Sequence, residues 1–299
     1  MHNNWTASNI PNLEGKISIV TGGNIGLGYK SSLELARQGA TVVIACRHED
    51  KGKNAIELIK KEVPEVKCDV ITLDLTDKDS IDKFAETFNS RYKQLDILLN
   101  NAGVVNLDSR QRSKDGHEMH MATNHLGHFA LTGRLFNVLK NTEYSRVVTV
   151  SSLAYKSGVI DYDDFTWEKR KYDRFKAYGD SKLANLLFMA QLQKMFVRVG
   201  SNAISVAAHP GLTGTDRQQS IGIGGALAKW IASPVSKGCL PQLLAATAPN
   251  VKMCEFYGPK YGILGTPRQQ QIKPELINDG QLEKFWLLSE KLTGVKYGE

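Results

Sequence analysis

Tyr178 and Lys182 are the two residues whose types and spacing best fit proton-transfer chemistry. They stand four positions apart in a stretch with helical character, so both side chains face one side of a helix, one turn apart. A free tyrosine has a pKa of about 10, and a neighbouring ammonium would lower that pKa by favouring the phenolate. The pair suits proton exchange with a carbonyl oxygen while a nicotinamide transfers hydride. Because this spacing is frequent in helices, it gains weight only from the residues around it.

The glycine-rich segment TGGNIGLG, residues 21–28, follows the apolar run Ile17–Val20 and precedes a predicted helix. A strand, a glycine turn and a helix in this order are typical of a pyrophosphate cradle. Gly22 would permit the tight turn, Gly26 the close approach of the backbone to phosphate, and Gly28 the packing of the helix on the sheet. The N–H groups that open this helix would point at the anion. The alternative is a flexible surface turn.

Arg47 indicates which dinucleotide the chain prefers. The predicted strand Thr41–Ala45 is followed by Cys46 and Arg47, with no acid before Glu49. An acid at this point would bond the ribose hydroxyl of NAD, whereas an arginine accommodates a 2′-phosphate. The sequence therefore favours NADP(H) over NAD(H). The alternative is a surface arginine without a ligand.

The elements that must position these residues alternate between strand and helix. Continuous Val/Ile runs with helices between them indicate strands buried on both faces of a parallel sheet. The predicted strands are Ile17–Thr21, Thr41–Ala45, Asp69–Leu73, Ile97–Leu99, Arg146–Ser151 and Ile204–Ala208, and the predicted helices are Tyr29–Gln38, Lys51–Glu62, Ser80–Arg91, His117–Leu139, Ala177–Met195 and Gly280–Leu292.

These elements predict an α/β fold: a single doubly wound Rossmann-type parallel sheet flanked by helices, with a C-terminal elaboration that covers the substrate. We expect one dinucleotide-binding domain over residues 1–299. Residues 1–14 form an N-terminal extension, and residues from about 212 to 265 form a substrate lid and C-terminal elaboration.

Composition narrows the class of protein. The 299 residues carry a net charge of +7, but the basic residues are interspersed with acids, which argues against a nucleic-acid surface. Neither the four cysteines nor the seven histidines show metal-ligand spacing, so we expect no metal and a reducing, cytoplasmic environment. The first fifteen residues lack the apolar core of a signal peptide, and no run approaches the roughly 18 apolar residues of a membrane span.

In order along the chain, the motifs resemble those of the short-chain dehydrogenase/reductases. They are TGGNIGLG, Asn100-Asn101-Ala102-Gly103, Asn124, Ser151-Ser152, Tyr178-x-x-x-Lys182 and Pro210-Gly211, and they cover residues from about 13 to at least 215. Within that superfamily, ACRHEDKG, NHLGHF, YGDSKLANLLF, HPG and EFYGP are similar to the retinol dehydrogenase-like branch.

The resemblance implies roles for four residues. Tyr178 would be the general acid in reduction, and Lys182 would lower its pKa and bond the nicotinamide ribose. Ser152 would hydrogen-bond the substrate carbonyl, with Ser151 as its competitor. Asn124 would hold a water for proton relay, unless it is a polar residue that merely faces its neighbours.

The same resemblance implies the cofactor contacts. Asp74 and Leu75 would meet the adenine, Asn101–Gly103 the middle of the cofactor, and Thr215 the carboxamide. Asn101 is equally compatible with a structural turn. The implied cofactor-binding residues are Gly22, Asn24, Ile25, Gly26, Leu27, Gly28, Arg47, Asp74, Leu75, Asn101, Ala102, Gly103, Tyr178, Lys182, Pro210, Gly211 and Thr215.

The chain departs from the family pattern at Gly23 and at one insertion, and it contains one apolar segment in the region that would cover the substrate. Gly23 stands where the family often has alanine, which we expect to loosen the turn. The insertion Asp161–Lys176 would border the substrate mouth through Trp167, Tyr172 and Phe175, although packing against the neighbouring surface explains them equally well. The segment Leu212–Trp230 has few charges, which suggests a lid over a lipophilic aldehyde or ketone; an amphipathic core helix is the alternative.

The sequence thus predicts an NADP(H)-dependent carbonyl reductase or alcohol dehydrogenase acting on a small molecule. The alternative is a non-catalytic NADP(H)-binding regulatory protein, against which the intact set Asn124, Ser152, Tyr178 and Lys182 argues. The substrate, the physiological direction and the choice between a homodimer and a homotetramer are not fixed by the sequence.

Overall fold

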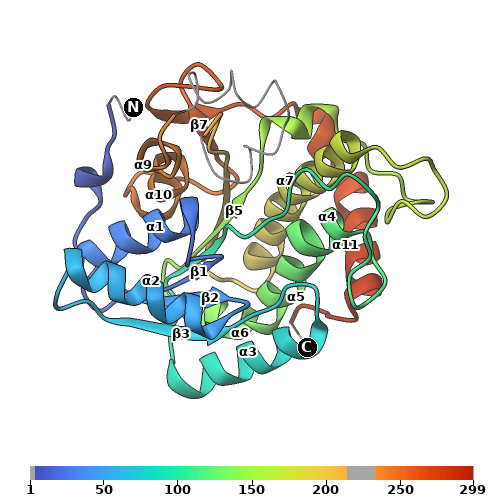
Figure 1. Cartoon of the computed structure of the whole chain (residues 1–299). Coiled ribbons are helices and arrows are strands. Elements are labelled where there is room, and N and C mark those ends of the chain that lie inside the picture. The colour runs from blue at the N-terminus through green and yellow to red at the C-terminus, as the bar shows by residue number, and fades with distance from the viewer. Residues whose placement is uncertain (1–3, 214–232, 299) are drawn as a thin grey trace.

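The computed structural model describes residues 4–213 and 233–298 and contains one eight-stranded sheet with the order β3-β2-β1-β4-β5-β6-β7-β8 (Figure 1). The strands are β1 Ile17–Thr21, β2 Thr41–Cys46, β3 Cys68–Thr72, β4 Ile97–Asn100, β5 Arg146–Val150, β6 Ile204–Ala208, β7 Phe256–Pro259 and β8 Pro267–Gln270. Neighbouring strands from β3 to β7 pair in parallel. The strand order reverses between β1 and β4, which is where ligands bind in open α/β sheets.

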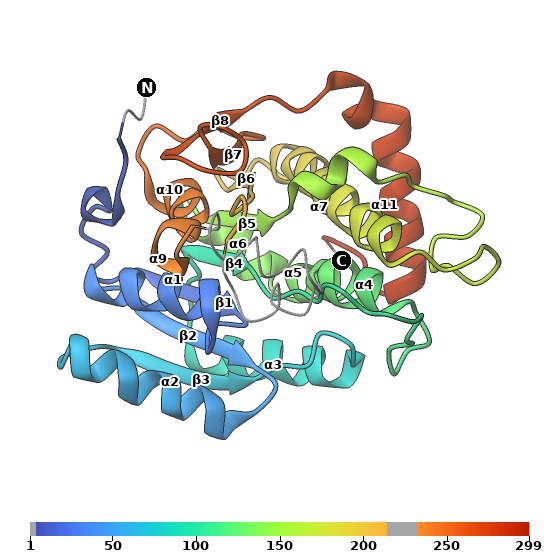
Figure 2. The same cartoon turned by 45° about the horizontal axis from the view of Figure 1, so that its top comes forward.

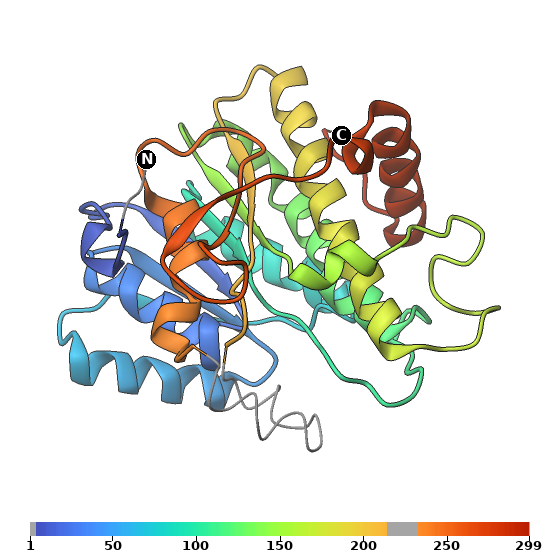
Figure 3. The same ribbon diagram turned by 90° about the horizontal axis from the view of Figure 1, so that it is seen from above.

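Helices cover both faces of the sheet, as a doubly wound fold requires. One face carries α1 Gly26–Arg37, α2 Glu49–Glu62 and α10 Leu240–Thr247, with α9 Val235–Gly238 beside α1 (Figure 2). The other face carries α3 Lys78–Arg91, α4 Met119–Met121, α5 Gly127–Arg134, α6 Phe136–Asn141, α7 Arg174–Arg198 and α11 Asp279–Thr293, with α7 and α11 packed together (Figure 3). Neighbouring residues of β1 serve opposite cores: Ile19 packs into the α7 side and Val20 into the α1 side.

The structure confirms the predicted fold class and corrects it at the C-terminal edge. The six predicted strands are present, each within one residue of its expected ends. The prediction missed β7 and β8, which are short and contain Gly258, Pro259 and Pro267 instead of a Val/Ile run. Because β8 pairs antiparallel with β7, the sheet is mostly and not wholly parallel.

The predicted single helix His117–Leu139 is wrong. The chain instead forms α4, a wide π-type turn η2 at Ala122–Leu126, then α5 and α6. Leu135 separates α5 from α6 with φ −97° and ψ 1°. Such wide turns interrupt α-helices frequently at functional sites, and this one contains Asn124.

Helix α7 is longer than predicted because Asp173 caps it. The Asp173 carboxylate accepts hydrogen bonds from the backbone N–H groups of Phe175 and Lys176, so the helix begins before the expected start at Ala177. The remaining short turns are η1 Ala7–Asn9, η3 Leu153–Ser157 and η4 Pro274–Ile277. Within residues 4–213 and 233–298, none of the helices combines the length and apolar character that a membrane span needs.

Candidate active site

A cleft of about 430 Å³ opens at the carboxyl ends of the central strands. Most of the predicted site residues lie together in its lining. The lining comprises Gly22, Ile25, Gly26, Leu27, Gly28, Asn101, Ala102, Gly103, Val104, Val105, Asn106, Val150, Ser151, Ser152, Ala154, Phe175, Tyr178, Lys182, Pro210, Thr213 and Val235. Of the other predicted cofactor residues, Asn24 belongs to the turn before α1, and Gly211 follows Pro210 with a φ of +69°.

The glycine segment forms a tight cradle between β1 and α1. Gly22 and Gly26 have φ values of +65° and +59°, which glycine adopts without strain. A Cβ at Gly28 would lie 2.2 Å from the carbonyl oxygen of Gly22, so α1 can approach the turn only because no side chain is present. A Cβ at Gly23 would lie 2.9 Å from both Ser32 Oγ and the oxygen of Val20, so the turn leaves little room there for the alanine that the family often has.

Asn101 is a structural turn residue that also lines the cleft. Its Nδ2 donates to the carbonyl oxygen of Thr21 at 2.8 Å, and its backbone N–H donates to Thr21 Oγ1 at 2.9 Å. Gln242 of α10 donates to Asn101 Oδ1 at 3.1 Å and to Ser31 Oγ at 2.8 Å. Sequence reasoning missed Gln242, because nothing in its local sequence indicates that α10 returns to this turn.

Ser152, and not Ser151, faces Tyr178. The Ser152 hydroxyl lines the cleft and hydrogen-bonds Tyr178. The Ser151 hydroxyl is buried and donates to the carbonyl oxygen of Lys182 at 2.7 Å, which fixes β5 against α7. The geometry therefore decides which of the two adjacent serines faces Tyr178, a choice that the sequence pattern left open.

Burial raises the pKa of Tyr178, and the hydrogen bond from Ser152 opposes that rise. The expected lowering of this pKa by Lys182 is not observed. Lys182 Nζ lies 5.6 Å from the centroid of the Tyr178 ring and donates to the carbonyl oxygen of Val150 at 3.0 Å. In this structure Tyr178 is therefore a phenol that keeps its proton at neutral pH.

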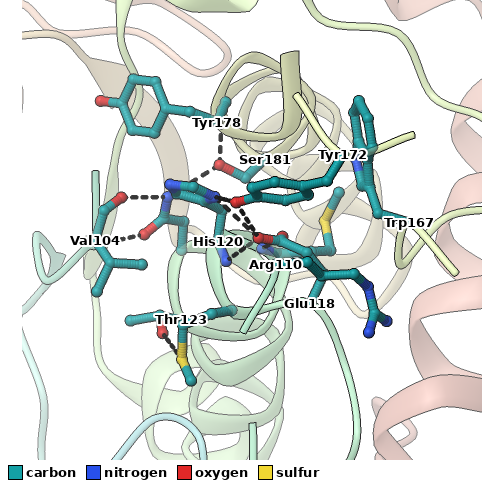
Figure 4. Close-up of polar contacts among 12 residues, drawn as sticks. Val104, Arg110, Glu118, His120, Thr123, Trp167, Tyr172, Tyr178 and Ser181 are labelled. Atoms are coloured by element: carbon teal, nitrogen blue, oxygen red, sulfur yellow. Dashed lines mark hydrogen bonds and ion pairs between the residues drawn. The ribbon is translucent and has the colours of Figure 1, made fainter. Parts of the chain in front are cut away.

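Asn124 bonds to the protein's own atoms through both ends of its amide. Its Oδ1 accepts from the Val104 N–H at 2.7 Å, and its Nδ2 donates to the Val104 oxygen at 3.1 Å and to Ser181 Oγ at 2.9 Å (Figure 4). The side chain thus joins the segment after β4, which lines the cleft, to α7. Its backbone carbonyl oxygen accepts from His128 Nδ1 at 3.1 Å.

The residues expected around the adenosine half lie apart from the cleft lining. Arg47 is exposed just after β2, whose residue Ala45 pairs with Thr21 of β1. Asp74 Oδ1 accepts hydrogen bonds from the backbone N–H and the hydroxyl of Thr76. Leu75 is buried against Gly127 of α5. Thr215 and the lid residues 214–232 lie outside the described residues.

The insertion 161–176 places one of its three aromatic residues in the cleft. Trp167 is 2% exposed, donates through Nε1 to Asp180 at 3.1 Å and stacks under Arg170 at 3.6 Å. The Tyr172 hydroxyl donates to Glu118 at 3.3 Å. Phe175 is 58% exposed and lines the cleft. Trp167 and Tyr172 therefore pack the insertion onto the fold, and Phe175 faces the cleft.

Comparison with known proteins places this geometry in a family context. The sequence model of the short chain dehydrogenase family matches residues 16–224. The chain is similar to retinol dehydrogenase 12 of Homo sapiens, at 37% identity over 286 residues that cover 95% of this chain and 88% of the relative. Retinol dehydrogenase 13 of Homo sapiens is 34% identical over 288 residues, with 95% and 86% covered. A solved structure of an uncharacterized protein from Mycobacterium Paratuberculosis has a TM-score of 0.84 and 35% identity, and covers 99% of this chain and 100% of its own.

Proposed function

Because the chain belongs to the short chain dehydrogenase family, whose members are oxidoreductases that bind a nicotinamide cofactor, we propose that it interconverts a lipophilic carbonyl compound and its alcohol with NADP(H). The observation that carries this proposal is the bond between Ser152 and the protonated Tyr178 inside the cleft, with Lys182 one helical turn further. In the reductive direction the protein is a carbonyl reductase, and in the oxidative direction an alcohol dehydrogenase.

The cleft fits a dinucleotide on structural grounds. Helix α1 can start close to the turn because Gly22 and Gly26 adopt positive φ and Gly28 carries no Cβ, and the N-terminus of α1 would supply N–H groups to an anion there. Asn101, Ala102, Gly103 and Pro210 would line the middle and nicotinamide parts of the cofactor. Asp74 and Leu75 would bound the adenine, and Gly211 and Thr215 would continue the nicotinamide side.

Proton transfer belongs to Tyr178 in this proposal. A nicotinamide cofactor held in this cleft would supply the hydride. The Ser152 hydroxyl donates a hydrogen bond to the carbonyl oxygen, and Tyr178 gives that oxygen its phenolic proton, so the carbonyl becomes an alcohol and Tyr178 a phenolate. Lys182 stabilises the phenolate once it forms and bonds the nicotinamide ribose. Asn124 supports the water that returns a proton to Tyr178.

The substrate class follows from the apolar part of the cleft. Val104, Val105, Ala154 and Phe175 line the same cleft as Ser152 and Tyr178, which favours a lipophilic aldehyde or ketone over a charged one. The similar proteins named retinol dehydrogenases support a lipophilic alcohol as the reduced form. We include in the proposal a single domain over residues 1–299 whose segment from about 212 to 265 covers this substrate.

The test compares NADPH oxidation by the parent, Tyr178→Phe and Lys182→Met on a panel of aldehydes and ketones. Tyr178→Phe removes the transferable proton and keeps the ring, so turnover should fall by a factor of about 10²–10⁴ while NADPH binding survives. Lys182→Met should also slow turnover and weaken NADPH binding. The two losses should not add, because both residues act on one proton transfer.

A Tyr178→Phe protein that keeps most of the parent rate would contradict the proposal. NADPH binding by the parent without turnover on any carbonyl or alcohol would favour the second candidate, a non-catalytic NADP(H)-binding regulatory protein.

A further inference from the structure

Glu118 is a fully buried carboxylate whose two oxygens are both occupied. Oε1 accepts from the backbone N–H of His120 at 3.0 Å and from His120 Nδ1 at 2.9 Å, and Oε2 accepts from the Met121 N–H at 2.8 Å. Burial alone would raise the pKa of Glu118, but the bonds from His120 and the two backbone groups outweigh it and hold that pKa below its usual range. Glu118 is therefore an anion at neutral pH that caps α4 and grips the ring of His120.

His120 lies between this anion and Tyr178. Its imidazole is fully buried and meets the ring of Tyr178 edge-on, with centroids 5.9 Å apart and an interplanar angle of 65° (Figure 4). Because an ionised carboxylate can only accept, Nδ1 of the imidazole carries a proton. Nε2 is buried and has no hydrogen-bond partner among the described residues.

A buried ring nitrogen without a hydrogen-bond partner is unfavourable, so stability alone does not explain this arrangement of Glu118 and His120. A fixed ring beside Tyr178, with one nitrogen held by a carboxylate, is instead suited to orienting its neighbour. Edge-to-face contacts of this kind favour one relative orientation of the two rings.

The insertion 161–176 also contacts Glu118 and His120. The Tyr172 hydroxyl donates to Glu118 Oε1 at 3.3 Å and lies 3.2 Å from His120 Nδ1. Tyr172 itself packs edge-on against Trp167, whose Nε1 donates to Asp180 on α7. The insertion and α4 are thus joined to the same helix that carries Tyr178.

We propose that Glu118 and His120 are a positioning pair for Tyr178. The carboxylate fixes the imidazole, the edge of the imidazole fixes the plane of the Tyr178 ring, and the phenol is thereby kept on Ser152 at the mouth of the cleft. Neither residue touches the reacting atoms. The inference rests on the proposed function only in assigning Tyr178 the proton transfer.

Steady-state kinetics on a carbonyl that the parent reduces test the catalytic consequence. His120→Asn keeps a donor for Glu118 and removes the ring, so kcat should fall roughly ten- to a hundredfold, the size expected for slightly misplaced reacting groups, while KM for NADPH changes less than about twofold. Glu118→Gln should lower kcat in the same direction. The double variant should lose no more than His120→Asn alone, because both act through one ring.

His125→Asn is the matched control. His125 is equally buried and also has one bonded and one unpartnered ring nitrogen, but its ring meets Phe129, Phe165, Phe188 and Phe285 and not Tyr178. The kcat of His125→Asn should match that of the parent after correction for the folded fraction, which thermal unfolding measures. Unchanged kcat in His120→Asn, or an equal loss in His125→Asn, would overturn the proposal.

NMR of the protein without added cofactor gives a readout that does not depend on turnover. The ring signals of Tyr178, assigned by their absence in Tyr178→Phe, should shift in His120→Asn and in Glu118→Gln but not in His125→Asn. Unchanged Tyr178 signals in His120→Asn and Glu118→Gln would overturn the proposed positioning role, even if the enzyme is active. If the parent reduces no carbonyl, the proposed function fails, and the Tyr178 signals still decide whether the pair orients this ring.

Discussion

At the scale of single residues, the proposed preference for NADP(H) depends on Arg47. Its guanidinium is exposed just beyond β2 and forms no ion pair with the part of the chain that the structure describes. We expect Arg47→Asp to weaken NADPH roughly ten- to a hundredfold, because a charge-assisted hydrogen bond contributes about 1.5–3 kcal/mol and a repulsion replaces it. NADH should be affected far less. Cofactor titrations by nucleotide fluorescence measure both affinities.

Arg91→Asp is the control, because Arg91 is also a surface arginine but forms an ion pair with Asp69 near the start of β3. It should leave both cofactor affinities unchanged. A parent protein that uses NADPH and NADH with equal efficiency would refute the assignment of Arg47.

At the scale of elements, the insertion 161–176 contains one buried aromatic residue, Trp167, and one that lines the cleft, Phe175. Phe175→Ala should change the relative kcat/KM of bulky and small carbonyls about tenfold, because it removes apolar surface from the cleft. Trp167→Ala should instead lower the free energy of unfolding by about 3–5 kcal/mol and keep the relative rates, since Trp167 is buried against Arg170 and Asp180. A substrate panel and a denaturation curve on each variant distinguish these outcomes. A changed preference in Trp167→Ala with unchanged Phe175→Ala would reverse the assignment.

At the scale of the whole molecule, buried histidines make stability depend on pH. Burial lowers the pKa of His125 to about 3 and those of His128 and His209 to about 4. Below a pH of about 6.5 these histidines bind protons in the unfolded chain but stay neutral in the folded protein. Their contribution to the free energy of unfolding is therefore present above that pH and is lost as the pH falls toward 4. Asp180 acts in the opposite sense, because burial raises its pKa to about 6.

His125→Phe isolates one of these contributions, because it fills the same aromatic cluster and does not titrate. Between pH 7 and 5, one such histidine changes the free energy of unfolding by about 2 kcal/mol. From pH 7 to pH 5, the free energy of unfolding of the variant should therefore fall by about 2 kcal/mol less than that of the parent, as measured by urea unfolding at both pH values. Parallel losses in the two proteins would show that His125 titrates normally in the fold.

The sequence by itself determined the elements whose signals are local. The Val/Ile runs define six strands because strands buried on both faces need apolar residues at every position. The glycine segment and the Tyr178–Lys182 spacing identify the cleft because a close backbone approach and one helical turn are properties of neighbouring residues. Strands β7 and β8 escaped prediction because glycine and proline dominate them and the sheet edge, not their own propensity, supports them.

Only the tertiary structure decided which side chains meet across long stretches of chain. Ser151 and Ser152 are equivalent by pattern, and contact with α7 alone assigns the inner one to Lys182 and the outer one to Tyr178. The same holds for the raised pKa of Tyr178, which follows from the burial that surrounding segments impose. The predicted helix is also interrupted by the turn Ala122–Leu126, in which Asn124 bonds to Val104 and Ser181, partners distant in sequence. Desolvation and long-range hydrogen bonds depend on the packed arrangement, and a linear pattern of residue types does not encode them directly.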